Sequence, residues 1–290
     1  MGVYSLKFII FNCFTNCVEI YNFIGLCYNP IRGGISLKLY EIAFSATGRT
    51  QKVVDSISPI FAKEKIKIDL SELNAENKIC NLSKDSFCIV AVPVYGCRVP
   101  APVVNRLHNI NGNGANALLV AVYGNRAIDD CLLELKNILT EQGFKCKTAI
   151  SAVAEHSMMP KFATNRPDSK DQEELKNFAL QIKEKLDNNT LSESVKVPSK
   201  MPYVKAANLP LKIKVNQDCI KCGKCAKNCP VGAIPFDNLS CTNSKKCITC
   251  MRCITECPQN ARTLPPALIS FVSVAMKSKF KGRKENTLYI

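Results

Sequence analysis

Two cysteine runs with the same spacing constrain this chain more than any other feature. The pattern C-x-x-C-x-x-C-x-x-x-C-P spans residues 219–230 and recurs over 247–258. Nine of the 17 cysteines lie between 219 and 257. Disulfide frameworks this dense belong to short secreted chains, whereas this chain has 290 residues. The clustering therefore favours metal centres in a reducing compartment, and we expect the cytoplasm.

Each run has the spacing of a bacterial iron–sulfur cluster-binding segment. Thiolates are soft ligands that suit such centres, and three of them in one short loop can converge on one face of a cubane. In two-cluster segments the fourth cysteine of each run binds the other cluster. The runs thus predict two 4Fe–4S clusters, the first on Cys219, Cys222, Cys225 and Cys257, the second on Cys229, Cys247, Cys250 and Cys253.

Structural zinc is the alternative, because C-x-x-C pairs are common in zinc sites. Zinc takes four ligands, usually as two separated pairs, so two full sets of four with matching prolines fit it poorly. Cys241 lies between the runs and is expected to bind nothing.

Residues 214–263 resemble the bacterial two-cluster ferredoxins. The resemblance implies a small α+β domain of βαββαβ type with pseudo-twofold symmetry and low-potential one-electron transfer.

Upstream of the cysteines, apolar runs alternate with helical periodicity, which indicates a doubly wound α/β domain over 37–187. Short apolar runs of this kind are typical of buried parallel strands, and right-handed crossovers connect them. Five strands in this length predict the strand order 2-1-3-4-5. The strands are expected at 39–45, 66–70, 87–94, 117–123 and 148–154, and the helices at 49–63, after Pro100, at 127–142 and at 168–187.

Three further segments lie outside these two domains. We interpret residues 1–36 as a translated leader that is not part of the native protein, because Arg32-Gly33-Gly34 can be encoded by a ribosome-binding-like stretch and Leu37 by the start codon TTG; a genuine, poorly ordered extension is the alternative. Polar residues interrupt its apolar runs, so it does not predict a membrane span. Only Lys7 could supply a basic n-region and no A-x-A cleavage site follows, so it does not predict a signal peptide. Residues 188–213 read as a linker, and 264–290 as a basic tail that is either solvated or a strap on the cysteine-rich domain.

Where the first predicted strand ends, the sequence Ser45-Ala46-Thr47-Gly48-Arg49-Thr50 leads into a helix. Hydroxyls and free backbone N–H groups at a helix N-terminus form an anion site, and Gly48 permits a close approach. The ATP-binding pattern G-x-x-x-x-G-K-[ST] and the dinucleotide pattern G-x-G-x-x-G are both missing from the chain. The loop therefore predicts a phosphate monoester site; an ordinary helix cap is the alternative.

Two other strand ends are expected at the same edge of the sheet, where ligands of such folds bind. They are Pro93-Val94-Tyr95-Gly96 and Tyr123-Gly124-Asn125. Each places a tyrosine beside a glycine, so that an aromatic ring could stack on a flat ligand. The alternative is that both tyrosines simply finish their strands.

Together these loops resemble those of the flavodoxins, over roughly 37–187. The resemblance implies that Ser45, Thr47 and Thr50, with the N–H groups of 46–50, hold the phosphate of FMN. It also implies that Tyr95 and Tyr123 flank the isoalloxazine ring. The whole chain resembles the fused proteins of anaerobic prokaryotes in which a flavodoxin domain precedes a two-cluster ferredoxin.

Four further residues carry expectations, and two of them have open roles. Cys97 stands where the flavodoxin pattern has glycine, and it is either a redox-active thiol or a tolerated substitution. His156 follows the fifth strand and is either a proton relay to the flavin or a polar loop residue. His108 is expected to be structural. Asp168 is expected to cap a helix.

The formal net charge is +15, and residues 211–290 carry 14 Lys or Arg against four Asp or Glu. This excess favours an acidic redox partner through electrostatic steering. Nucleic acid is not expected, because no recognition module accompanies the charge. The sequence thus predicts an iron–sulfur flavoprotein that acts as a low-potential electron carrier. The alternative is an FMN-dependent reductase of a small-molecule acceptor.

Overall fold

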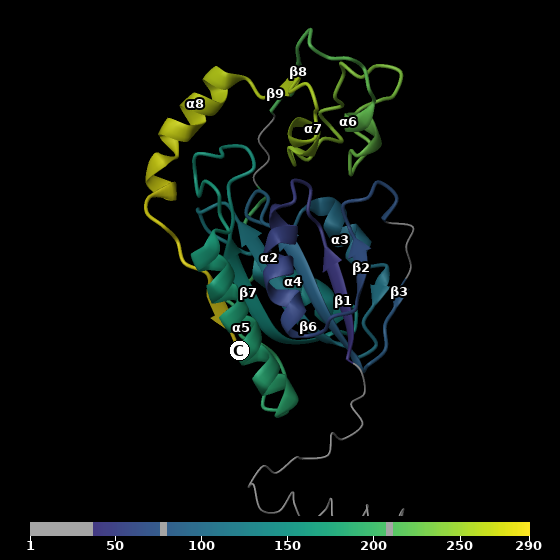
Figure 1. Cartoon of the computed structure of the whole chain (residues 1–290), viewed down its shortest axis with the longest axis vertical. Coiled ribbons are helices and arrows are strands. Elements are labelled where there is room, and N and C mark those ends of the chain that lie inside the picture. The colour runs from purple at the N-terminus through teal and green to yellow at the C-terminus, as the bar shows by residue number, and fades with distance from the viewer. Residues whose placement is uncertain (1–36, 76–79, 207–210) are drawn as a thin grey trace, which may run out of the picture. The chain divides into compact units, whose positions relative to one another are not determined.

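The computed structural model describes residues 37–75, 80–206 and 211–290. The interpretation of residues 1–36 as a leader lies outside these ranges. A six-stranded sheet forms the centre of the first domain (Figure 1). Its strands are β1 (Lys38–Ala43), β2 (Lys65–Asp69), β4 (Ser86–Pro93), β6 (Asn116–Tyr123), β7 (Lys145–Val153) and β10 (Thr287–Tyr289).

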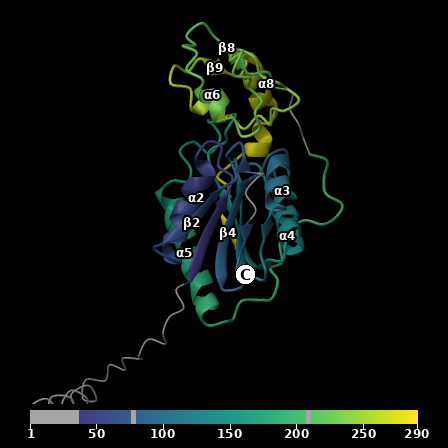
Figure 2. The ribbon, with the colours of Figure 1, turned by 90° about the vertical axis from the view of Figure 1, so that its right-hand side faces the viewer.

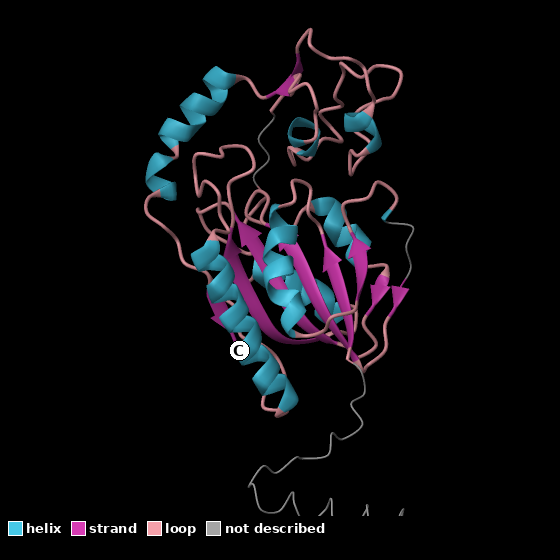
Figure 3. Ribbon diagram, in the orientation of Figure 1, coloured by secondary structure: helices cyan, strands magenta, loops and turns pink. Residues whose placement is uncertain are grey.

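Five of these strands pair in parallel, and the sixth does not. The order across the sheet is β10-β7-β6-β4-β1-β2, so the parallel strands alone run β2-β1-β4-β6-β7. The predicted count of five strands was too low, because the C-terminal strand β10 adds antiparallel to the edge of β7. Figure 3 shows the parallel strands pointing to one edge of the sheet, which brings their carboxyl ends together. A separate short parallel pair joins β3 (Cys80–Asn81) to β5 (Ile110–Asn111).

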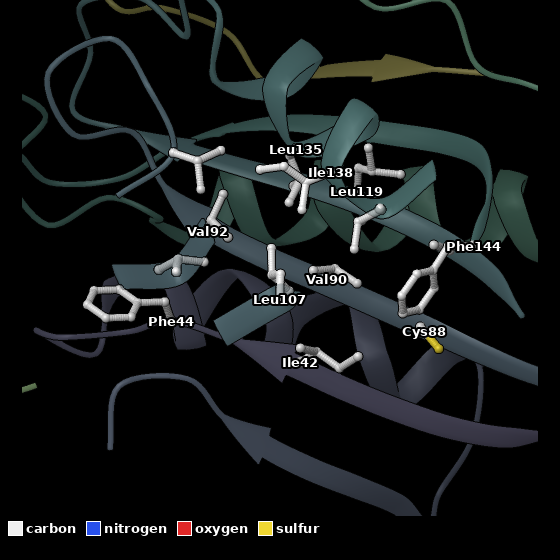
Figure 4. Packing of buried hydrophobic residues seen from close by; sticks show 14 of the residues in the cluster. Ile42, Phe44, Cys88, Val90, Val92, Leu107, Leu119, Leu135, Ile138 and Phe144 are labelled. Atoms are coloured by element: carbon white, nitrogen blue, oxygen red, sulfur yellow. The ribbon is translucent and has the colours of Figure 1, made fainter. Parts of the chain in front are cut away.

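Helices cover both faces of the sheet (Figure 2). On one face, α2 (Arg49–Ile57) and α5 (Ser169–Asp187) bury residues such as Val54 and Leu175. On the other face lie α3 (Ala101–Leu107) and α4 (Cys131–Glu141). Their residues Leu107 and Leu135 belong to the same hydrophobic cluster as Val90 of β4, and Leu107 lies beside Val90 (Figure 4). These two apolar layers stabilise the sheet from both faces, and the sheet in turn positions the loops at the carboxyl ends of its strands.

Local chemistry explains where the helices begin and end. The helix expected at 49–63 stops at Ile57 and continues as a 3₁₀ turn over Ser58–Ile60, since Pro59 cannot donate the next backbone hydrogen bond. The side chain of Asp168 accepts a hydrogen bond from the N–H of Asp171, and the Asp171 side chain binds back to the N–H of Asp168. This reciprocal capping box confirms Asp168 as the predicted cap of α5.

The segment predicted as a linker is docked over much of its length. Val195 is buried, and its N–H donates to the carbonyl of Cys146 over 2.9 Å. The Tyr203 ring lies 4.4 Å from the Arg98 guanidinium. Residues 195–204 therefore belong to the surface of the α/β domain. Proline-broken, polar composition predicted the absence of regular structure here but not the docking.

Residues 214–263, called the cluster domain below, contain little regular structure. The described residues form one antiparallel pair, β8 (Lys214–Val215) with β9 (Arg262–Thr263), and two single-turn helices, α6 (Lys224–Lys227) and α7 (Arg252–Thr255). This is fewer strands than the ferredoxin resemblance implied. The repeat is nevertheless visible in the backbone, because α6 and α7 both begin after a left-handed residue, Gly223 (φ 74°) and Met251 (φ 68°).

The basic tail runs back to the α/β domain. After α8 (Pro266–Ala275) and a 3₁₀ turn (Lys277–Phe280), the chain ends in β10 on the sheet. We call residues 276–290 the C-terminal strap. The structure corrects the prediction of a strap on the cluster domain, because the end of this strap pairs with β7 of the α/β domain. Lys277, Lys279 and Lys281 are exposed, as the alternative prediction of a solvated face has it. None of the helices in the described ranges combines the length and apolar character that crossing a bilayer requires.

Candidate cofactor sites

The loop between β1 and α2 has the geometry of an anion site. Gly48 adopts φ 78° at the start of α2, and a Cβ added to it would meet no atom within 4 Å. Ser45 shapes the turn, because its hydroxyl accepts a hydrogen bond from the N–H of Gln51 over 2.9 Å. Its own N–H donates to the Ser71 hydroxyl over 2.7 Å. Ser45 therefore stabilises the conformation of the loop through these two hydrogen bonds.

The donors of this loop are available to a ligand. Within the described part of the chain, no group accepts a hydrogen bond from the backbone N–H groups of 46–50. The same holds for the hydroxyls of Thr47 and Thr50, although Thr50 is buried. Unpaired N–H groups at a helix N-terminus bind phosphate well, because the helix dipole adds to the hydrogen bonds. The residues present thus fit a phosphate group.

Arg49, the one cation in the loop, already has a carboxylate partner. Its guanidinium forms an ion pair with Glu155, which follows β7. Burial alone would raise the pKa of Glu155, but hydrogen bonds from the Asn165 N–H and from Arg49 outweigh it and lower that pKa. Glu155 is therefore charged at neutral pH, and Arg49 contributes to the site mainly by tying the ends of β1 and β7 together.

The loop after β4 forms a tight turn beside the cradle. Tyr95 and Arg98 exchange two backbone hydrogen bonds of 3.1 Å, with Gly96 (φ 54°) and Cys97 (φ 76°) between them. A left-handed conformation suits glycine, so the position of Cys97 explains why the flavodoxin pattern has glycine there. The Cys97 sulfur accepts a hydrogen bond from Arg126 over 3.3 Å.

Tyr95 sits at the centre of this edge of the sheet. Its ring meets Phe44 edge-on, with 6.3 Å between the ring centres. Burial and then the nearby Cys250 raise its pKa well above the usual range, against the smaller effects of Arg49 and Arg252. Tyr95 thus lies between the phosphate loop and the cluster domain. Pro93 and Val94 place it there, since the N–H of Val94 continues the sheet by donating to Val122.

The loop after β6 is engaged by the C-terminal strap. The amide of Asn125 donates to the carbonyls of Phe280 and Gly282 over 3.0 and 2.9 Å, and it accepts from the N–H of Lys284. The Tyr123 hydroxyl donates to the Glu285 carbonyl over 3.3 Å. Sequence reasoning missed these contacts. The predicted roles of Tyr123 and Asn125 in flavin binding stay predictions, and their polar side-chain atoms have other partners.

His156 has a structural environment. A Cβ on Gly124 would lie 2.7 Å from its ring, so glycine is required there for packing. Nδ1 of His156 accepts hydrogen bonds from the N–H groups of Met158 and Met159, and its ring meets Phe280 edge-on. Burial, then the charges of Arg126 and Arg49, lower the pKa of His156 to about 4. The imidazole is neutral at pH 7, which favours the polar loop role over the proton relay.

The eight predicted ligand cysteines divide into two groups of four. One cavity is lined by Cys229, Cys247, Cys250 and Cys253, which we call the second set. A separate cavity is lined by Cys219, Cys222, Cys225 and Cys257, the first set. In each set the fourth cysteine comes from the other run. The grouping is the crossed one that the spacing predicts, and cluster binding itself stays a prediction.

Both sets offer the soft sulfur donors that iron–sulfur clusters take. The sulfurs of Cys229 and Cys257 accept hydrogen bonds from the N–H groups of Ala233 and Ala261 over 3.2 and 3.3 Å, at matching places in the repeat. Across the described residues, no group of three or more Cys, His, Asp or Glu side chains is close enough to hold one metal ion. A cubane takes four thiolates, one on each iron atom, and each set supplies four cysteines.

The second set is the more buried of the two. Burial is the largest cause of the pKa shifts in this set, and it raises the pKa of Cys250 to about 12 and that of Cys253 to about 11. It also raises the pKa of Cys247. Thiols this hard to ionise are protonated at neutral pH without metal, and ligation must displace the protons. By contrast, Cys222 of the first set is exposed.

The second set also faces the α/β domain. Cys250 belongs to the same hydrophobic cluster as Phe44 and Val92 of the sheet. Arg252 donates to the Ser71 carbonyl over 2.9 Å, close to the phosphate loop. From the other side, the buried Arg106 of α3 donates to the Pro230 carbonyl over 2.6 Å and to that of Leu70. Neither arginine was predicted, because a lone arginine in a helix gives no signal of its partner.

Comparison with known proteins agrees with the cysteine spacing. Residues 218–261 match the 4Fe-4S dicluster domain family. No curated protein sequence matches the chain.

Among solved structures, a flavodoxin of Streptococcus pneumoniae TIGR4 is 18% identical and covers 50% of this chain and 99% of its own, with a TM-score of 0.33. The FMN-bound flavodoxin of Fusobacterium nucleatum is 16% identical, with coverages of 51% and 98% and a TM-score of 0.34. An FMN-dependent NADH-azoreductase from Bacillus anthracis is 11% identical, with coverages of 50% and 99% and a TM-score of 0.32. Similarities this weak carry no functional conclusion. The firm result is that the segment with both cysteine runs is similar to the 4Fe-4S dicluster domains.

Proposed function

We propose that this chain is an iron–sulfur flavoprotein that holds two 4Fe–4S clusters and FMN and serves as a low-potential electron carrier. The observation that carries the proposal is the position of the second cysteine set. Cys250 packs into the core of the α/β domain, and Arg252 bonds to Ser71, whose hydroxyl accepts from the phosphate loop. Two sites that suit redox cofactors are thus built against each other.

The chain's own residues supply binding and exclusion of water. The N–H groups of 46–50 and the hydroxyls of Thr47 and Thr50 would hold the FMN phosphate, and the two cysteine sets would hold the clusters. When bound, each cluster can exchange one electron and FMN one or two. Phe44 and Cys250 belong to one hydrophobic cluster and Tyr95 packs against it, so apolar side chains would limit water between the sites.

Anaerobic purification with cofactor analysis tests the proposal. We expect close to eight iron and eight sulfide per chain, from two cubane clusters, and one FMN. Iron and sulfide without flavin, even after reconstitution, would overturn the flavoprotein and leave a ferredoxin fused to an α/β domain. A screen of electron acceptors on the same sample separates the carrier from the reductase. Turnover of a small molecule, and not only of redox proteins and one-electron dyes, would favour the reductase.

A further inference from the structure

The two cysteine runs have the same spacing but different surroundings. In the second run, Ile248 packs against the core of the α/β domain and Cys250 is buried in it. The residues at the same positions of the first run are Ile220, whose exposed fraction is 62%, and Cys222, which is also exposed. One half of the repeat is therefore docked on a protein surface, and the same place on the other half is open.

The two runs also differ in charge, and the first run carries the more exposed positive charge. At three positions of the first run stand Lys221, Lys224 and Lys227, all exposed, where the second run has Thr249, Arg252 and Thr255. Arg252 is used internally, by Ser71 and Glu256. The three lysines, in contrast, form no ion pair with any residue in the described ranges.

Lys221, Lys224 and Ile220 line the cavity of the first set, and no acidic side chain lines it. Lys227 follows Lys224 by three residues in α6, which places both on the same side of that helix. Asp218, the nearest carboxylate in sequence, accepts a hydrogen bond from Asn216. An exposed apolar residue with unpaired cations near it in the same short segment suits a partner protein whose contact face is acidic.

We propose that Ile220, Lys221, Lys224 and Lys227 form the docking face for an acidic one-electron carrier protein, which binds over the first cysteine set. The contact of Ile248 and Cys250 with the α/β domain shows how a protein surface covers the same positions of the repeat. This deepens the proposed function and rests on it, since a carrier must exchange electrons with a partner. The basic face would steer the partner towards the exposed set and away from the buried one.

Binding can be measured without turnover. The oxidised holoprotein is titrated with a small acidic bacterial ferredoxin, also oxidised, at low and at high salt. We expect Lys221→Glu with Lys224→Glu to raise the dissociation constant at low salt by about tenfold or more, and to flatten its salt dependence. Lys221→Gln with Lys224→Gln should give an intermediate value.

A matched control has the same change in net charge. Lys170→Glu with Lys176→Glu alters two exposed lysines of α5 on the α/β domain, and it should change the dissociation constant by less than about twofold. Iron and sulfide contents show that each variant keeps its cluster domain. Absent or salt-insensitive binding, or equal loss in the control, would overturn the docking face. The proposed function fails separately, on missing flavin or clusters in the unmodified protein.

Discussion

Thr47 and Thr50 offer the sharpest single-residue test of the anion site, because valine keeps their shape and removes only the hydroxyls. Each hydrogen bond to a charged group contributes about 1.5–3 kcal/mol, and 1.4 kcal/mol is a factor of ten in affinity. We expect Thr47→Val with Thr50→Val to weaken FMN binding by about 100-fold or more, measured by fluorescence titration, with iron content unchanged. Thr140→Val is the control, since that hydroxyl bonds within α4. Equal affinities would mean that phosphate binds elsewhere.

His156 gives the α/β domain a specific dependence on pH. Its pKa is lowered to about 4 in the folded state, against an ordinary value of about 6.5. The unfolded chain therefore takes up a proton first as the pH falls. The stabilisation from the neutral imidazole is complete above pH 6.5 and is lost progressively down to about pH 4, in total about 3 kcal/mol.

The measurement is denaturant unfolding of the wild-type protein and of His156→Gln between pH 4 and 7.5. We expect the wild-type protein to lose more stability on acidification than the variant, because the variant lacks this titrating group. Parallel curves would show that burial does not hold the imidazole neutral.

At the scale of elements, β10 adds a sixth strand to the sheet, although no pattern in the sequence indicates it. Leu288 pairs with Ile150 of β7, and the Asn286 side chain accepts a hydrogen bond from the Val153 N–H over 2.8 Å. The amide of Asn286 also donates to Asp171 and Glu174. The strap is thus bonded to both the sheet and α5.

Deleting residues 286–290 should destabilise the α/β domain by about 3 kcal/mol, because it leaves a buried N–H and a buried carboxylate with fewer partners. Amide exchange at Ala149–Ser151 should accelerate, while the centre of β4 stays protected. Deleting Ile290 alone, which is exposed and lies beyond β10, should have no such effect. Unchanged exchange in β7 after the longer deletion would contradict the assigned pairing.

The elements that were predicted share a local signal. Apolar runs such as 87–94 mark β4, and Asp168 marks the start of α5, since strands and caps follow from neighbouring residues. The strap could not be predicted, because three residues are too few to show a strand period and their partner is more than 130 positions away. The same reason hid the partner of Arg106 in the Pro230 carbonyl. Asn125 was placed at the correct edge of the sheet, but what it binds depends on the strap.

Across the whole molecule, the internal repeat links the two halves of the cluster domain by exchanging one cysteine each. Cys229 belongs by sequence to the first run, yet it lines the cavity of the second set, and Cys257 does the reverse. Damage at one run should therefore reach the metal of the other. The α/β domain contacts the chain at this exchange, because Arg106 donates a hydrogen bond to the carbonyl of Pro230, directly after Cys229.

Pairs of serine variants distinguish crossed from uncrossed ligation by iron content alone. If Cys229 and Cys250 serve one cluster, the double variant Cys229→Ser with Cys250→Ser should lose no more iron than either single variant and keep about four atoms. Cys229→Ser with Cys222→Ser should lose both clusters, since Cys222 lines the other cavity. Uncrossed ligation predicts the reverse result for the two pairs. Single variants that each retain one cluster are the control, and electron paramagnetic resonance of the reduced samples identifies the cluster that remains.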